Sequence, residues 1–134
     1  MRIFLWKLFP PYEVVATKNA LKEFLDAHDG LARSRIEEIF FGYLKRNPKT
    51  VVDSIRLNHK TPHQVALCIV VALLRIQLGS GNFHTYRDHL SMGGENMRSV
   101  WSAAVDELVK EGLESPEGAK EARAELAEDI RSAG

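Results

Sequence analysis

The longest apolar run of the chain, Val65–Leu74, predicts a helix at the centre of the fold. Every residue of this run is hydrophobic, so periodicity cannot separate a buried helix from a buried strand. The flanks favour a helix, because Thr61 and Gln64 form a capping box, in which each side chain bonds the other residue's backbone N–H. Gly79 then supplies a stop signal. We expect a helix over about 62–78 that is apolar on all sides.

A helix of this kind has to be enclosed by protein or by lipid. A membrane span needs about 20 apolar residues, and Arg75 lies inside the candidate segment. A charged side chain within a span is costly. The sequence therefore predicts no transmembrane segment and a buried central helix.

Apolar residues at helical spacing predict further helices on both sides of this segment. The expected ranges are 13 or 17 to 28, 34–46, 50 to about 58, 97 to about 112, and 116 to about 130. The connection of residues 111–115 is short, so the last two helices should pack antiparallel. The fold class expected is all-α: a single-domain bundle of five or six helices over 1–134, with an apolar N-terminal arm (1–11) and a glycine-bracketed loop (79–94).

The overall composition is that of a globular protein. The chain has 134 residues, of which 45% are hydrophobic and 27% charged, and its formal net charge is zero. A neutral total argues against a dedicated nucleic-acid-binding protein, yet residues 39–87 contain seven basic residues and one acidic residue. Such a bias can mark a binding face, but it more often means that two regions of a chain attract each other.

Five basic residues make nucleic-acid binding an alternative function. They are Lys45, Arg46, Lys49, Arg56 and Lys60. The two short helices around residues 47–50 do not match a helix-turn-helix, because the turn contains proline and the second helix is short. Electrostatic binding to phosphates stays open.

A second alternative is a small enzyme or ligand-binding protein with its site in the loop 83–89. Here His84 or His89 could act as a base, Asp88 could orient it, and Arg87 could hold an anion. The chain has no nucleophile motif and no phosphate-binding glycine loop, so the sequence favours a structural role for this loop. We expect no catalytic activity.

Arg75 needs an explanation, because a charge is seldom buried without a partner. The sequence favours emergence of its side chain into solvent at the helix end, where a cation is stabilised. The alternatives are a pair with a carboxylate such as Glu95, Glu107 or Glu111, and an anion pocket that Arg75 shares with Arg87.

The metal-binding and thiol residues point to no cofactor. Cys68 is the one cysteine of the chain, which excludes an internal disulfide, and its apolar surroundings predict an inert thiol. His59 and His63 lie on either side of a helix start and do not share a helix face, so a zinc site there is disfavoured. We expect no metal.

The N-terminal segment 1–9 is dense in large apolar residues, including Phe4, Trp6 and Phe9. Lys7 interrupts it and no small-residue cleavage site follows, so it does not match a signal peptide, and the cytoplasm is the expected location. The segment could pack on the chain's own bundle, contact a second subunit, or anchor the chain at a membrane surface, and the sequence favours them in that order. Large aromatic residues are enriched at interface centres.

We therefore expect a non-catalytic interaction or regulatory domain whose partner is a second copy or another protein. Self-association would use the N-terminal arm or the apolar stripe 97–109, which contains Trp101. The alternative for Trp101 is a place in the core, which the sequence favours.

Overall fold

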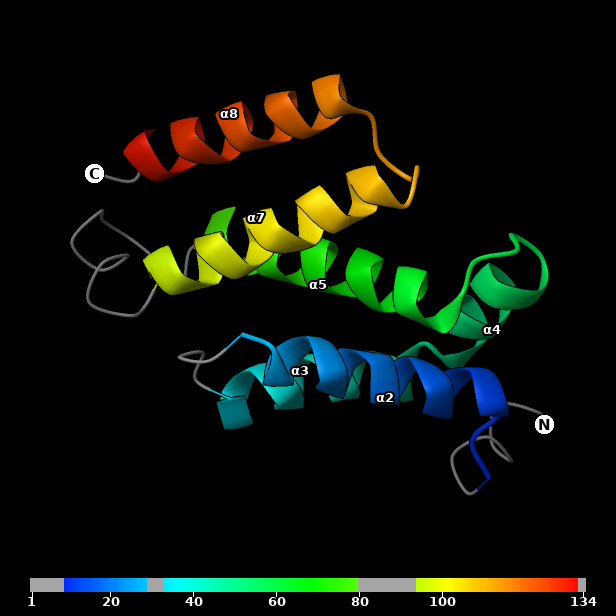
Figure 1. Cartoon of the computed structure of the whole chain (residues 1–134). Helices are drawn as coiled ribbons and strands as arrows, with labels where there is room; N and C mark the ends of the chain where they lie inside the picture. The colour runs from blue at the N-terminus through cyan, green and yellow to red at the C-terminus, as the bar shows by residue number, and fades with distance from the viewer. Residues whose placement is uncertain (1–8, 29–32, 80–93, 133–134) are drawn as a thin grey trace. The chain divides into compact units, whose positions relative to one another are not determined.

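The computed structural model describes residues 9–28, 33–79 and 94–132, and over these ranges the chain forms six helices and no strand (Figure 1). The helices are α2 (Tyr12–Asp26), α3 (Arg33–Arg46), α4 (Pro48–Arg56), α5 (Pro62–Gly79), α7 (Gly94–Lys110) and α8 (Pro116–Ser132). The predicted all-α class is confirmed. The chain divides into two compact units, residues 1–69 and 70–134, which both contain part of α5. The expectation of one domain over 1–134 stays a prediction.

The start of α5 follows the predicted capping box. The backbone N–H of Gln64 donates to Thr61 Oγ1 at 3.1 Å, and the backbone N–H of Thr61 donates to Gln64 Oε1 at 3.0 Å. Two of the N–H groups that a helix start leaves unpaired are therefore satisfied by side chains. This reciprocal pair fixes the first turn of the most apolar helix.

The buried residues of α5 come from both of its halves. They are Val65, Ala66, Leu67 and Ile69 in the N-terminal unit and Val70, Leu74 and Leu78 in the C-terminal unit. Ile76 lies on an exposed side and keeps 62% of its surface accessible. Among the described helices, α5 alone is long and apolar enough to cross a membrane, and 39% of its 18 residues are buried. Core helices of soluble proteins meet the same criterion of length and composition.

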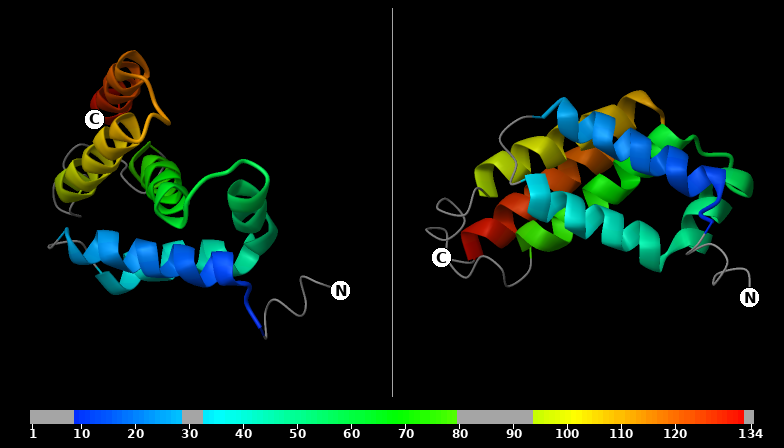
Figure 2. Two further views of the ribbon diagram at one scale, coloured as in Figure 1. Left: turned by 45° about the vertical axis from the view of Figure 1, so that its right-hand side comes forward. Right: turned by 90° about the horizontal axis from the view of Figure 1, so that it is seen from below.

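The N-terminal unit packs α2 against α3 and α4, and α3 against α4 (Figure 2). Its core consists of Leu21, Phe24 and Leu25 from α2, Ile36, Phe40 and Leu44 from α3, and Val51 and Val52 from α4. Helix α4 begins at Pro48, two residues before the predicted start at Thr50. Proline is favoured at the first helical position, because that residue's N–H would have no partner within the helix.

The C-terminal unit packs α7 against α8 in the predicted antiparallel arrangement (Figure 1). The predicted stripe of α7 is buried except for Val109, which is half-buried; its buried members are Met97, Val100, Trp101, Ala104, Val105 and Leu108. Gly112 ends this helix with a φ of 75°, which glycine adopts at little cost. Ser115 Oγ accepts a hydrogen bond from the N–H of Gly118 at 2.9 Å, so it caps α8 as expected.

Candidate interaction surfaces

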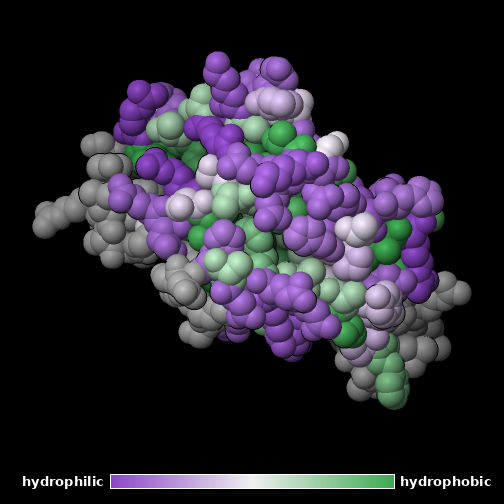
Figure 3. Space-filling view, in the orientation of Figure 1, coloured by the Kyte–Doolittle hydropathy of each residue, from purple (hydrophilic) through white to green (hydrophobic). Residues whose placement is uncertain are grey.

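The two most exposed large apolar side chains of the described residues, Phe9 and Tyr12, lie where α2 begins. Phe9 is 75% exposed, Tyr12 77% and Val15 41%. Tyr12 and Val15 lie one turn apart on α2, and Phe9 precedes the helix. Leu57, at 69% exposure, directly follows Arg56, whose guanidinium binds Glu13 next to Tyr12. We call these four residues the apolar end; Figure 3 shows hydrophobic surface at its lower right, where α2 begins in Figure 1.

The ion pair between Glu13 and Arg56 lies next to the apolar end. Arg56 donates from Nε to Glu13 Oε2 at 2.7 Å and from Nη2 to Glu13 Oε1 at 3.1 Å. This bidentate contact lowers the pKa of Glu13, although burial of the carboxylate opposes the shift, and the same contact raises the pKa of Arg56. The two charges compensate each other, so the apolar end is flanked by a neutral pair.

The five basic residues of the nucleic-acid alternative differ in their surroundings. Lys49 Nζ lies 2.7 Å from Asp53 Oδ2, one turn along the same helix, and Arg56 is held by Glu13. Lys45 and Arg46 are exposed at the end of α3, and Lys60 is half-buried. Two members of the set therefore face carboxylates, which reduces the positive potential that they offer to phosphates.

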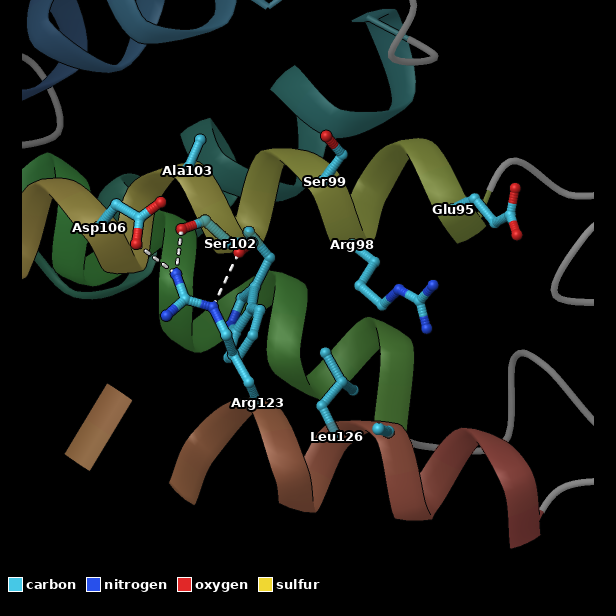
Figure 4. Close-up of a pocket in the computed structure, with 10 residues that line it drawn as sticks. Glu95, Arg98, Ser99, Ser102, Ala103, Asp106, Arg123 and Leu126 are labelled. Atoms are coloured by element: carbon cyan, nitrogen blue, oxygen red, sulfur yellow. Dashed lines mark hydrogen bonds and ion pairs between the residues drawn. The ribbon is translucent and has the colours of Figure 1, made fainter. Parts of the chain in front are cut away.

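A groove of about 650 Å³ lies along α7 and α8 (Figure 4). Its lining includes Trp101, Leu126 and Ala127 as apolar residues and Glu95, Arg98, Ser102, Asp106 and Arg123 as polar ones. The side chain of Arg98 extends from α7 on the side of α8, away from Arg123, and Glu95 lies near the start of α7 (Figure 4).

Arg123 fixes one end of this groove. Its Nε donates to Ser102 Oγ at 2.9 Å, its Nη2 donates to the Ser102 carbonyl at 3.1 Å, and the same nitrogen pairs with Asp106. These contacts join α8 to α7 with the planar fork of one guanidinium. The position of Arg123 is therefore set by the packing of the two helices, and the groove between them is preformed at this end.

Arg75 pairs with Asp129 of α8 instead of emerging alone into solvent, and its side chain keeps 29% of its surface exposed. Pairing with a carboxylate was one of the predicted alternatives, but the partner differs from the three acidic residues that the sequence suggested. A Cβ at position 79 would meet the end of the Arg75 guanidinium, which would have to shift. No local pattern in the sequence indicates a partner so distant along the chain.

The predicted interaction residues divide into three groups. Phe9 is exposed, whereas Trp101 is 2% exposed and its indole N–H donates to the Val71 carbonyl at 3.1 Å. Trp101 therefore belongs to the core of the C-terminal unit. Phe4 and Trp6 lie outside the described residues.

The loop alternative also lies outside the described residues. This applies to His84, Arg87, Asp88 and His89, so the catalytic set and the anion pocket with Arg87 stay predictions. Over the ranges that are described, no three histidine, cysteine or acidic residues gather in a way that could hold a metal ion.

The single thiol lies in α5, and its side chain is partly buried. Burial raises the pKa of Cys68, and the charge of Lys60 opposes this shift. A raised pKa keeps the thiol protonated and poorly nucleophilic. Its surroundings thus agree with the inert thiol expected from the sequence.

Sequence reasoning missed Tyr12, Val15 and Leu57 as members of a surface. One signal was available for the first two: the spacing of three residues from Phe9 to Tyr12 to Val15 places large apolar side chains at successive turns. No comparable signal points to Leu57, whose place depends on how α4 packs against α2.

Comparison with known proteins finds no relative. No protein-family model matches the chain, and neither a curated protein nor a solved structure shows significant similarity to it. The function therefore has to be inferred from the apolar end and from the groove along α7 and α8.

Proposed function

We propose that this protein is a non-catalytic interaction domain of the cytoplasm that self-associates through the apolar end. The observation that carries the proposal is the exposure of Phe9 and Tyr12, at 75% and 77%. Aromatic side chains are enriched at the centres of protein interfaces, where they contribute much of the binding energy. Exposed apolar side chains at successive turns, as Val15 and these two are, mark interaction sites more often than scattered ones do.

The electrostatics of the apolar end support the same function. A contact between proteins removes water from the groups that it covers, and an unpaired charge makes this costly. Glu13 and Arg56 already satisfy each other through two hydrogen bonds. A partner can therefore cover this end without leaving either charge unpaired.

The sequence extends this apolar character in the N-terminal direction. Residues 1–8 contain Phe4 and Trp6, and they connect directly to Phe9. Together they would provide more aromatic area for a contact than the described residues alone. The proposed partner is a second copy of the chain; another protein with a complementary apolar surface is the alternative.

The test is sedimentation of the full-length chain over a wide range of concentration. The double variant Tyr12→Ser/Val15→Ser removes two side chains of the apolar end, and Ile76→Ser is the matched control, because Ile76 is exposed elsewhere. The wild type should associate as its concentration rises, and the double variant should weaken the association by about tenfold or more.

The Ile76→Ser control should sediment like the wild type. Circular dichroism of all three proteins should be alike, since the replaced side chains are exposed. A wild type that stays monomeric throughout would overturn the proposal, as would a double variant that associates as tightly as the wild type.

A further inference from the structure

Helix α8 buries fewer residues than its neighbour α7, although both helices have 17 residues. Three residues of α8 are buried, Ala119, Leu126 and Ile130, whereas seven are buried in α7. Regions with few buried apolar contacts open at a lower free energy than the core of a protein does. Of these two helices, α8 is therefore the one that should leave the fold first.

The ion pairs that join α8 to its neighbours are partly exposed. Arg123 pairs with Asp106 of α7 (Figure 4), and Asp129 pairs with Arg75 of α5. The four side chains keep between 29% and 64% of their surface accessible. Salt screens the attraction between exposed charges. A higher salt concentration should therefore weaken the attachment of α8.

The connection between α7 and α8 allows the two helices to separate without leaving their ends unpaired. The N–H of Leu113 donates to the Leu108 carbonyl at 2.9 Å and completes the end of α7. Ser115 Oγ caps α8 by accepting from the N–H of Gly118. Neither bond joins one helix to the other, so both persist when α8 moves away.

Trp101 lies next to α8 but is held by α5. Trp101 and Leu126 both line the groove along α7 and α8, and Trp101 is 2% exposed. Its indole N–H donates to the carbonyl of Val71 in α5. Departure of α8 would therefore uncover the indole ring without releasing it.

We infer that α8 is a lid over Trp101, which opens as one unit while α5 and α7 stay folded, and that salt favours the open state. This inference goes beyond self-association and does not depend on it, since its residues lie in the C-terminal unit and the apolar end lies in the other. Alanine, glutamate, lysine and arginine, which favour helix, make up most of α8. The freed segment therefore keeps part of its helical order, which lowers the free energy of opening.

The test is amide hydrogen exchange of the full-length chain, read residue by residue in α7 and α8 at low concentrations of urea. Residues 119–130 should share one opening free energy and exchange about tenfold faster, or more, than the slowest residues of α7. Their opening should also depend less on urea, because lifting one helix exposes less surface than unfolding the chain does.

Two variants that each remove one positive charge from α8 test the ion pairs. Arg123→Gln breaks the contacts with α7, whereas Arg131→Gln is the matched control, because Arg131 pairs with Glu128 within α8. Arg123→Gln should speed exchange in α8 about tenfold and reduce the acceleration by salt, and Arg131→Gln should do neither. Asp129→Asn, which breaks the pair with Arg75, should act like Arg123→Gln and serves if that variant does not fold.

Three results would overturn the inference. If α8 and α7 had the same opening free energy and the same dependence on urea, α8 would leave only when the chain unfolds. Protection that declines steadily from residue 119 to residue 132 would be fraying of the chain end. An equal acceleration by salt in the wild type and in Arg123→Gln would exclude the role of the ion pairs.

Discussion

The two units hold their helices together by different means. In the N-terminal unit, α2 contributes large buried side chains, Leu21, Phe24 and Leu25. In the C-terminal unit, α8 buries Ala119, Leu126 and Ile130, so its apolar stripe is thin. Two arginines provide further contacts between α8 and its neighbours: Arg123 joins α8 to α7, and Arg75 of α5 pairs with Asp129 of α8. A helix with little apolar area can thus be positioned by guanidinium groups that bond its neighbours.

The surfaces of the two units also differ in their apolar and charged character. The N-terminal unit leaves large apolar side chains exposed at one end and compensates the adjacent charges with the Glu13–Arg56 pair. The C-terminal unit has a groove with charged walls and an excess of acidic residues. The exposed apolar residues therefore lie in the N-terminal unit, and the groove with charged walls lies in the C-terminal unit.

The largest loss of stability should come from replacing Leu126, which is fully buried in the packing of α8. Leu126→Ala would remove the main apolar contact of this helix and leave a cavity, with an expected loss of about 2–5 kcal/mol in the free energy of unfolding. Urea unfolding followed by circular dichroism measures this loss. A change below about 1 kcal/mol would mean that the arginine contacts, not Leu126, hold α8 in place.

A smaller loss is expected when the guanidinium that joins α8 to α7 is replaced. Arg123→Lys keeps the positive charge but cannot contact the Ser102 hydroxyl, the Ser102 carbonyl and Asp106 together. The expected loss is about 1–2 kcal/mol. Arg131→Lys is the control, since Arg131 pairs with Glu128 within α8 and such a pair contributes only a few tenths of a kcal/mol. Equal effects of the two variants would contradict the role given to Arg123.

The smallest expected loss of stability comes from removing the ion pair between Glu13 and Arg56, and this loss depends on pH. The pKa of Glu13 is lowered in the folded chain from its usual value of 4.5. Its contribution to stability is therefore complete above about pH 4.5 and is lost as the pH falls through the lowered folded pKa. Glu13→Gln should be less stable than the wild type by about 1 kcal/mol at neutral pH, and the two should converge in acid. Thermal unfolding across this pH range measures it; a constant difference at all pH values would contradict the pairing.

Much of the helical framework could be predicted from the sequence, because its signals are local. The capping residues Thr61 and Ser115 act as expected, and the apolar spacing of α7 identified the side that is buried. Local signals also misplaced the start of α4, since Thr50 and Pro48 both suit a helix start and the earlier residue begins it. Where two start signals overlap, sequence alone does not rank them.

The candidate surfaces could not be predicted in full, because they depend on contacts between distant residues. Glu13 and Arg56 are 43 positions apart, and Arg75 and Asp129 are 54 apart. The residues around each of these side chains do not indicate which distant residue it pairs with. The groove likewise depends on the register that brings Arg123 opposite Ser102. Hydrophobicity alone also cannot tell that Tyr12 faces solvent while Leu21 on the same helix is buried.

The central claim is self-association through the apolar end, and the most direct measurement is the sedimentation coefficient of the unmodified chain over about a thousandfold range of concentration. The sedimentation coefficient should rise with concentration, because the apolar side chains of two copies leave water when they meet. A sedimentation coefficient that stays at the monomer value over the whole range would contradict it.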